Sequence, residues 1–329
     1  MAQRTSAIQR ASALVLPVGI LVALVTAVTF PGPGTAIGRL AVGPFDWASL
    51  SVIVIFLITG YSLKLAEVTD SGFGKAVVLV VGINLIVAPA LAWVTVRGVA
   101  LPLGIAMGIA LMASVSTTNS SAVVTAIVAG GDRTWAAGLT VICVVAGAFT
   151  APLAVSAILS AHASASPGSL LVRVVTIVVV PLVVGWVMGR LVERQLPRWV
   201  DLVPPLAVIS VVWVTMSKSA SALASATALM IGLVIVVALV GHGVLLGLGS
   251  LAARPFPPKQ RWPVLFVTAQ KTLPVALSLL IVLTGEAPDL VAVAGEAVLV
   301  CLAWHFLQIL IDSVIAGRIA SRRVPTSAD

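Results

Sequence analysis

The sequence predicts an all-α membrane protein with ten transmembrane helices in two inverted five-helix repeats. Three observations predict this class. First, the 329-residue chain is 60% hydrophobic and only 9% charged, whereas a soluble domain carries about 25% charged residues. Second, apolar segments of membrane-spanning length follow one another along the chain. Third, each half contains a short polar break at a corresponding position, which is typical of secondary transporters built from inverted repeats.

The ten expected spans account for most of the chain. Their predicted bounds are 12–30, 48–66, 75–96, 101–129, 134–160, 170–191, 200–217, 225–252, 262–284 and 289–317. Spans 1–5 form a first repeat over 1–161, and spans 6–10 form a second over 170–329. The linker at 162–169, HASASPGS, is small, polar and proline-containing. Because each repeat has an odd number of spans, the second copy is inverted in the membrane.

Basic residues predict the orientation of the chain in the membrane. With the N-terminus inside, fourteen Lys and Arg residues fall in cytoplasmic segments and four in outer segments, while Lys271 lies inside span 9. Such a bias places both termini in the cytoplasm, here of the cell (inner) membrane. The net charge of +8 therefore reflects topology, and no nucleic-acid partner is expected. Neither metal-ligand spacing nor a catalytic motif predicts an enzyme.

The first polar break lies in span 4 and has the sequence SVSTTNSS over residues 114–121. Unwound backbone at membrane depth survives only where it lines a cavity or meets a substrate. The hydroxyl and amide groups here suit a Na⁺ ion or a substrate oxyanion. A half-helix that begins after Ser120 would also point its positive end at an anion. The alternative is ordinary helix–helix packing. The candidate residues are Thr117, Thr118, Asn119, Ser120, Ser121 and Thr125.

The second break lies in span 9, where Lys271 stands close to Pro274. Proline prevents continuous helical hydrogen bonding, and an ionisable residue at membrane depth is a functional candidate. Lys271 could neutralise an anionic substrate or exchange its proton during transport; the alternative is a structural lysine that binds freed carbonyls. Gln270 and Thr272 are candidates beside it. Glu296, in span 10, is the expected carboxylate partner of Lys271.

Other polar residues within the spans have weaker functional signals. Asn84, in the middle of span 3, is either interhelical glue or a binding residue. His242 and His305 are expected to be packed side chains, with a proton relay as the alternative. Asp312 lies near the cytoplasmic end of span 10 and is expected to contact water.

Three of these segments resemble motifs of the bile acid:sodium symporter superfamily. Asn84–Pro89 resembles its Gln/Asn-x-x-x-x-Pro element, and Ser116–Thr125, followed by Gly131-Asp132, is similar to its crossover motif. Gln270-Lys271-Thr272-Leu273 resembles the Gln-Lys-Ser-Leu of its SBF-like branch. The resemblance implies a core domain (spans 3–5 and 8–10) that moves against a panel domain (spans 1, 2, 6 and 7). The inverted repeat itself predicts that the broken spans 4 and 9 cross near the midplane. If transport is coupled to Na⁺, the possible ligands are Asn84, Thr118, Asn119, Ser121, Thr125 and Gln270.

The chain departs from the family pattern near the implied sodium site. Ala122 stands where family members usually have Asn. Sodium-coupled members carry a Glu early in the span 9 motif, whereas this chain has only the apolar Val267 near that position. Lys271 adds a cation close to that place, and Coulomb repulsion at low dielectric disfavours Na⁺. Sodium coupling is therefore doubtful, proton coupling stays open, and no other cofactor is expected.

These features predict a secondary active transporter of an organic anion, either bile-acid-like or a small carboxylate, that works by alternating access in the lipid bilayer. Lys271 would act as counter-charge to the substrate or as a substitute for the coupling ion. One alternative keeps the fold and retains Na⁺-coupled symport. A second alternative is a non-transporting membrane regulator or scaffold that uses the same fold to bind a partner.

Overall fold

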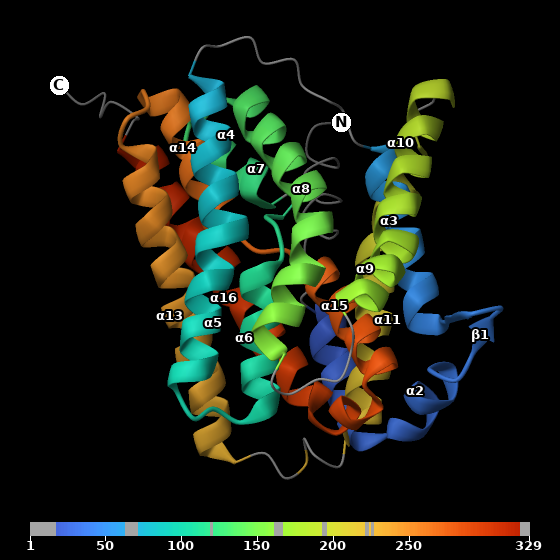
Figure 1. Ribbon diagram of the computed structural model, residues 1–329. Helices are drawn as coiled ribbons and strands as arrows, with labels where there is room; N and C mark the ends of the chain where they lie inside the picture. Colours follow the sequence, from blue (N-terminus) through green and yellow to red (C-terminus); the bar gives the residue numbers. More distant parts are fainter. Residues whose placement is uncertain are drawn as a thin grey trace. The chain divides into compact units, whose positions relative to one another are not determined.

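The protein is built almost entirely from helices (Figure 1). The computed structural model describes residues 18–62, 72–118, 121–160, 167–192, 196–220, 224 and 227–322. Within these ranges the strands are β1 (Ala41–Val42) and β2 (Phe45–Asp46), a short antiparallel pair. The all-α prediction is confirmed, because the apolar segments hydrogen-bond their own backbones as helices.

Helices occupy all ten segments that the sequence predicts as spans. In the N-terminal half the helices, with the short α2 between two of these segments, are Val18–Thr29, α2 (Pro31–Ile37), α3 (Trp47–Tyr61), α4 (Phe73–Gly82), the π-helix η1 (Ile83–Val87), α5 (Ala88–Gly98), α6 (Leu103–Ser114), α7 (Ser121–Val128) and α8 (Arg133–Leu159). In the C-terminal half they are α9 (Pro167–Val174), the π-helix η2 (Val175–Val179), α10 (Val180–Val192), η3 (Arg198–Leu202), α11 (Val203–Lys218), α13 (Ala228–Ala253), α14 (Pro258–Ala269), α15 (Leu273–Glu286), η4 (Pro288–Val293) and α16 (Ala294–Ser321).

Six described helical stretches are long and apolar enough to cross a membrane. They are Phe73–Gly98, Arg133–Leu159, Leu171–Val192, Ala228–Ala253, Pro258–Glu286 and Pro288–Ser321. The bent pair Val18–Thr29 and Pro31–Ile37 makes a seventh if it is one span, and α3, α6 and α11 are apolar but shorter. These helices support a membrane protein. The count of ten spans and the inverted repeat stay predictions.

The chain divides into two compact units, and each draws on both halves of the sequence. Unit 1 comprises residues 1–63, 163–227 and 277–298, and unit 2 comprises 64–162, 228–276 and 299–329. Unit 2 therefore contains predicted spans 3, 4, 5 and 8 with parts of 9 and 10. Unit 1 contains spans 1, 2, 6 and 7 with the remainder. Both polar breaks lie in unit 2.

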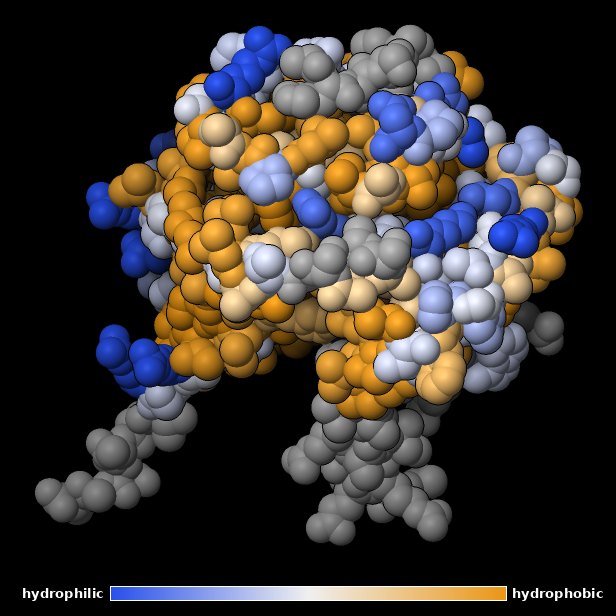
Figure 2. Space-filling model, turned by 90° about the horizontal axis from the view of Figure 1, so that it is seen from below, coloured by the Kyte–Doolittle hydropathy of each residue, from blue (hydrophilic) through white to orange (hydrophobic). Residues whose placement is uncertain are grey.

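Many large apolar side chains of unit 2 are exposed, as lipid contact requires. Val78 of α4, Val94 of α5 and Val240 of α13 are each more than half exposed. Figure 2, which views the molecule from below, shows apolar residues over much of the surface and hydrophilic residues around the rim. An exposed apolar surface of this kind would be unfavourable in water, so these helix faces match a hydrocarbon solvent.

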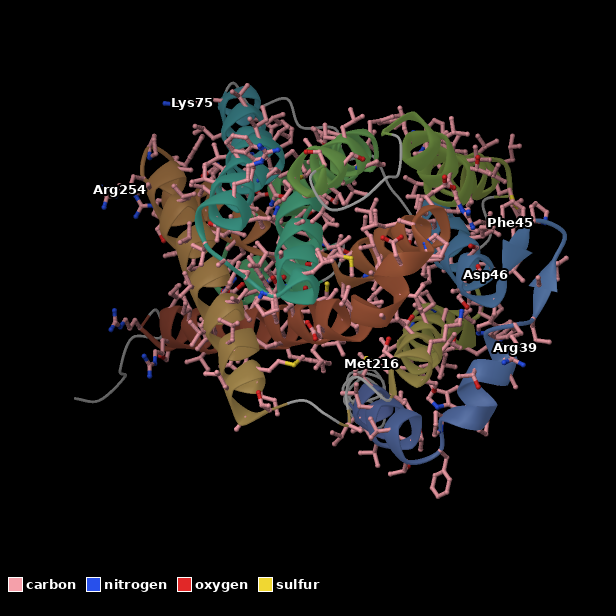
Figure 3. The ribbon with its side chains drawn as sticks, turned by 60° about the horizontal axis from the view of Figure 1, so that its bottom comes forward. Arg39, Phe45, Asp46, Lys75, Met216 and Arg254 are labelled. Carbon is pink, nitrogen blue, oxygen red and sulfur yellow. The ribbon has the colours of Figure 1, made fainter. Side chains whose placement is uncertain are left out.

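One end of unit 2 is held together by aromatic packing and carries several basic residues. The ring of Trp135 lies edge-on to Phe73 and Phe256, at centroid distances of 5.3 and 5.8 Å. This cluster joins the starts of α4 and α8 to the loop between α13 and α14, where Phe256 is the third residue after α13. Lys75 and Arg254 therefore belong to the same end of the unit, where Figure 3 labels both. Such clustering is what the positive-inside rule expects of a cytoplasmic end.

Opposite ends of unit 2 should label differently in a topology experiment. We expect Arg254→Cys to react with a membrane-impermeant maleimide only after right-side-out vesicles are permeabilised, because Arg254 is exposed at the basic end. The matched variant Arg97→Cys, at the far end of the same helical stretch as Lys75, should react in intact vesicles. Native Cys143 and Cys301 are buried and should stay unlabelled. Labelling of Arg254→Cys in intact vesicles would contradict the orientation.

Two glycines let helices α3 and α10 of unit 1 approach within backbone contact. A Cβ built at Gly60 would collide with the carbonyl of Leu182, and one at Gly185 with the carbonyl of Leu57. Small residues at helix contacts allow this approach in membranes. Because the obstacles are backbone atoms, no side-chain rotation relieves them.

Gly185→Ala should therefore destabilise the protein. Overpacking costs about 1–3 kcal/mol, so the apparent Tm in detergent should fall by several degrees. Gly232→Ala is the matched control. Gly232 lies exposed in α13 with no atom within 4 Å of an added Cβ, and alanine there favours the helix by up to about 1 kcal/mol. Equal shifts of the two variants would show that close packing of α3 on α10 is not the cause.

Candidate functional site

Both predicted breaks exist, and they contact each other inside unit 2. Helix α6 ends at Ser114, and α14 ends at Ala269; the next residue of each, Val115 and Gln270, is extended with ψ of 157° and 148°. The amide of Thr272 donates a 2.9 Å hydrogen bond to the carbonyl of Ser116. The sequence prediction of two interrupted helices that meet is confirmed. Their depth in the bilayer stays a prediction.

Lys271 lies at the junction of the breaks and is fully buried. Its Nζ donates to four neutral oxygens: the carbonyls of Asn84 (2.7 Å), Val115 (2.8 Å) and Ala113 (2.9 Å), and Oδ1 of Asn84 (2.9 Å). None of these oxygens can donate a proton, so the geometry matches an ammonium with three N–H groups. The side chain thus satisfies backbone carbonyls freed by the first break, as in the structural alternative.

The carbonyl of Asn84 is available to Lys271 because of local helix chemistry. Asn84 lies in the π-helix η1, where an amide bonds the carbonyl five residues earlier, as the amide of Ala88 does with Ile83. The amide that would bond Asn84 in this register belongs to Pro89, which has no N–H. The Asn-x-x-x-x-Pro spacing therefore leaves the carbonyl of Asn84 without a partner inside its own helix.

The Asn84 side chain connects this free carbonyl to the second break. Its Nδ2 donates to the carbonyls of Thr268 (3.1 Å) and Val267 (3.3 Å), which end helix α14. Its Oδ1 accepts from Lys271. One buried amide thus satisfies groups from both sides of the junction, as the interhelical alternative expects, and a ligand-binding role for Asn84 stays a prediction.

Gln308 of α16 binds the backbone of Lys271 through both ends of its amide. Its Oε1 accepts from the Lys271 amide at 2.9 Å, and its Nε2 donates to the Lys271 carbonyl at 2.6 Å. His305 Nδ1 lies 3.1 Å from Gln308 Nε2. The sequence analysis did not select Gln308. Its signal was the spacing of residues 305, 308 and 312, which puts three polar side chains on one face of a helix.

Hydroxyls of the first break gather around the amide oxygen of Gln270. Thr118 and Ser121 donate to Gln270 Oε1 at 2.9 and 2.6 Å. Thr118 Oγ1 also accepts the amide of Ala122 at 3.0 Å, which caps the start of α7. Thr125 Oγ1 lies 3.5 Å from Gln270 Nε2. Predicted residues from the two breaks are therefore joined in one polar cluster.

The expectation that Asp312 contacts water is wrong. Asp312 is fully buried, and its Oδ1 lies 3.0 Å from Nε2 of His242, which is also fully buried. Its Oδ2 accepts from Gln270 Nε2 at 3.0 Å. Position near the end of a predicted span suggested exposure, but α13 and α14 supply partners that enclose the carboxylate. His242 is likewise a hydrogen-bond partner of Asp312 rather than only a packed ring.

The remaining predicted site residues have different outcomes. Thr117 is buried, and its hydroxyl has no hydrogen-bond partner in the described part of the chain. Asn119 and Ser120 lie outside the described residues. Glu296 belongs to unit 1, whereas Lys271 belongs to unit 2. Because neutral oxygens already use every N–H of Lys271, this ammonium does not require Glu296, and their pairing stays a prediction.

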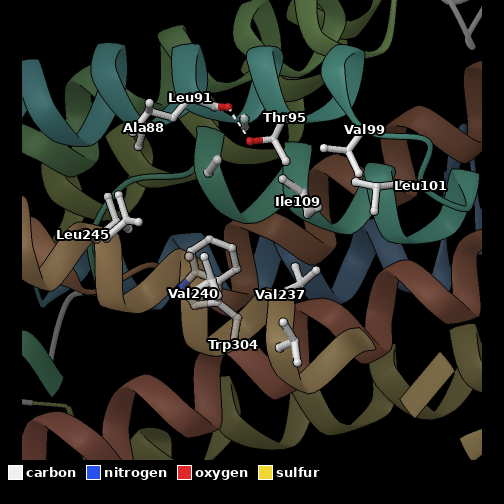
Figure 4. A pocket seen from close by; sticks show the side chains of 15 residues that line it. Ala88, Leu91, Thr95, Val99, Leu101, Ile109, Val237, Val240, Leu245 and Trp304 are labelled. Carbon is white, nitrogen blue, oxygen red and sulfur yellow. Dashed lines mark hydrogen bonds between the residues drawn. The ribbon is translucent and has the colours of Figure 1, made fainter. Parts of the chain in front are cut away.

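Unit 2 also contains an apolar pocket of about 370 Å³ (Figure 4). Its walls come from α5, α6, α13 and α16, and Trp304, Leu91 and Val240 are among its lining residues. The hydroxyl of Thr95 bonds the carbonyl of Leu91 at 2.8 Å rather than serving a ligand. Lacking a charged group, the lining suits hydrocarbon and not a carboxylate.

Comparisons with known proteins agree with these motifs. The model of the SBF-like CPA transporter family matches residues 15–321. A protein of Arabidopsis thaliana named "Probable sodium/metabolite cotransporter BASS4, chloroplastic" is 27% identical over 329 residues, which cover 93% of this chain and 73% of that protein. The protein of the same name from Oryza sativa subsp. indica is 26% identical over 330 residues, covering 92% and 74%. The predicted resemblance is confirmed.

Proposed function

Because the chain belongs to the SBF-like CPA transporter family, we propose that it is a secondary active transporter of a small organic anion that works by alternating access. In this proposal the ammonium of Lys271 takes the place of a coupling sodium ion. The membrane helices and the names of the relatives support transport of a metabolite. Crossed, interrupted helices are the usual position of a transporter's binding site.

The observation that carries this proposal is the set of ligands around Lys271. Three backbone carbonyls and one amide oxygen converge on its Nζ at 2.7–2.9 Å. Neutral oxygens of this kind, at unwound helix ends, are what transporters use to coordinate Na⁺. A tethered ammonium that occupies such a cage excludes a second cation by repulsion.

The same contacts favour one of the two roles predicted for Lys271. A counter-charge for substrate would have to reach the substrate, but the lysine is fully buried and all its bonds go to the protein. We therefore retain the role of coupling-ion substitute and do not retain that of counter-charge.

A polar pocket of unit 1 supports an anion of small size. The pocket holds about 140 Å³ and includes Arg173, Lys218 and the hydroxyl-bearing Thr215, Ser219 and Thr284 among its lining residues. Asp46 also lines it, but this carboxylate already accepts from the amide of Ser49 at 2.9 Å. Arg173 already pairs with Glu286 at 3.4 Å, so Lys218 and the hydroxyl groups are what the pocket offers a carboxylate, and the volume suits a small acid better than a sterol acid.

Sodium independence of binding tests the proposal. A thermal-shift screen of organic anions identifies a ligand, since a ligand that binds the native state raises its Tm. We expect the Kd of that anion to be the same in sodium buffer and in choline buffer. If Na⁺ strengthens binding tenfold or more, about 1.4 kcal/mol of coupling, the substitution is wrong.

Sodium-coupled anion symport is the second candidate, and the names of the relatives favour it. Its ligands would be the oxygens of Thr118, Ser121, Thr125 and Gln270, which are clustered beside Asp312. In this reading a sodium ion binds next to the ammonium rather than in its place. The choline comparison separates the two candidates, because only symport makes anion affinity depend on Na⁺.

A further inference from the structure

The buried, hydrogen-bonded pair of His242 and Asp312 is not used by the sodium-independent transport proposed above. Both side chains have zero exposed surface, and their N···O distance is 3.0 Å. A buried carboxylate is costly in a membrane protein unless it has a function, and intramembrane carboxylate and histidine groups commonly relay protons. The pair joins α13 to α16, two helices that are distant in sequence.

One atom of the pair is left without a partner. Nε2 of His242 is bonded to the carboxylate, whereas Nδ1 is buried and accepts or donates nothing among the residues that the structure describes. Buried polar atoms are nearly always paired, so an exception calls for an explanation. A ring that donates from Nε2 has its lone pair on Nδ1, and that lone pair is a place where a proton can bind.

The charged surroundings of His242 are few. Besides Asp312, the titratable groups that the neighbouring elements bring to the polar cluster are Lys271 in the second break, His305 on α16 and Cys143 on α8. Helices α6 and α7 carry no titratable residue, and those of α4, α5 and α14 lie near the ends: Lys75, Arg97, Lys259 and Arg261. The pair is therefore the one described place in this cluster where a carboxylate and an imidazole meet.

We propose that the His242–Asp312 pair is a proton-binding site of unit 2. A proton from the aqueous phase adds to the pair on Nδ1 of the imidazole, while the Nε2–carboxylate hydrogen bond is kept. The same proton leaves when the pair is next exposed to water. No bond between heavy atoms changes, and no metal or organic cofactor is needed.

Gln270 connects this site to the first break. Its Nε2 donates to Asp312 Oδ2, and its Oε1 accepts from Thr118 and Ser121. When a proton is added, the pair changes from one net negative charge to neutral, so the carboxylate holds the Gln270 amide less strongly. Proton binding therefore changes the hydrogen bonds of Gln270 to the hydroxyls of Thr118 and Ser121 at the start of α7, which are three hydrogen bonds away from the proton.

The charges of unit 2 indicate how this site would serve transport, an argument that rests on the proposed function. With neutral His242, the ammonium of Lys271 and the carboxylate of Asp312 balance each other. After proton uptake the buried set carries one net positive charge. A monovalent anion would restore neutrality, which corresponds to symport of one proton with one carboxylate.

Histidine NMR tests proton binding directly, because the chain contains only three histidines. The protein is labelled with ¹⁵N-histidine, placed in lipid nanodiscs without any organic anion, and titrated over pH 4.5–9. His242→Gln and His305→Gln assign the resonances. We expect the His242 nitrogens to change from the neutral to the imidazolium pattern within this titration. A His242 signal that is constant over the whole range overturns the proposal.

Asp312→Asn tests the pair itself, since asparagine preserves shape and removes the charge. We expect the His242 midpoint to move by at least one pH unit in this variant and to be unchanged in His305→Gln, the matched control. An unchanged midpoint in Asp312→Asn overturns the pairing. If Asp312→Asn does not fold, the pairing is tested on the wild type instead. The ¹⁵N titration is then combined with infrared difference spectra of the Asp312 carboxylate band between pH 5 and pH 8.

Failure of this proposal is distinguishable from failure of the proposed function. The titration uses no substrate, so a constant His242 signal refutes the proton site even if sodium-independent anion binding is found. Conversely, titration of His242 without any anion ligand in the thermal-shift screen would leave the proton site supported and count against the anion.

Discussion

Lys271→Met is expected to cause a large loss of stability, of several kcal/mol. Methionine fills similar space but cannot donate, so the carbonyls of Asn84, Ala113 and Val115 and the Oδ1 of Asn84 lose their donor. Each buried group left unpaired costs about 1–3 kcal/mol, with less where water or relaxation helps. The apparent Tm in one detergent and at one pH measures the effect.

Lys271→Ala gives the sharper version of the same test. Removing the side chain leaves the oxygen cage open, so a sodium ion can enter and stabilise the fold by RT ln(1 + [Na⁺]/Kd). We expect the Tm of Lys271→Ala to rise in sodium buffer relative to choline buffer. Wild type and Lys271→Met, whose cages are filled, should not respond. If all three variants respond alike, the cage does not select cations.

Gln308→Leu should have an effect second only to that of Lys271. The amide of Gln308 bonds both the N–H and the C=O of Lys271, at 2.9 and 2.6 Å. Leucine leaves the N–H of Lys271 unpaired in a dry interior and leaves its C=O with only His305 Nδ1, at 3.4 Å. An unpaired buried group costs about 1–3 kcal/mol, and the weakened carbonyl contact adds to this. We expect a lower apparent Tm and loss of any anion-induced thermal shift, because the second break loses its support.

Gln260→Leu is the matched control for this change. Gln260 lies at the start of α14 in the same unit, and its Oε1 has no hydrogen-bond partner among the described residues. The same substitution there should shift the Tm by no more than a degree or two. A Gln308→Leu protein as stable as Gln260→Leu would show that the amide bridge to Lys271 contributes little.

The breaks could be predicted from sequence because their signals are local. Proline near Lys271 and a run of hydroxyl residues around Thr118 both disfavour a continuous helix at the positions where α14 and α6 end. The Asn84–Pro89 spacing was identified as well, although its reason, a carbonyl freed in a π-helix, required the structure.

The pairing of buried residues could not be predicted in the same way. Asp312 and His242 are 70 residues apart, and their contact depends on how α13 packs near α16. The position of Asp312 near the end of a predicted span suggested contact with water, whereas the tertiary neighbours of a side chain decide whether it is buried. Gln308 could have been found, since it shares a helix face with His305 and Asp312. A carboxylate was the expected partner of Lys271 because every residue has a backbone carbonyl, so the sequence cannot indicate which carbonyls bind the lysine.

A cation attached to the backbone differs from a dissolved one in what work it can do. Sodium released on the far side of a membrane yields the free energy of its gradient, whereas in the proposed function Lys271 would return with the protein on every cycle. Its local concentration is set by the covalent tether and not by the medium. The ammonium therefore occupies the oxygen cage at any sodium concentration. A carrier of this kind follows the gradient of its own cargo unless a second, dissociable ion completes the cycle.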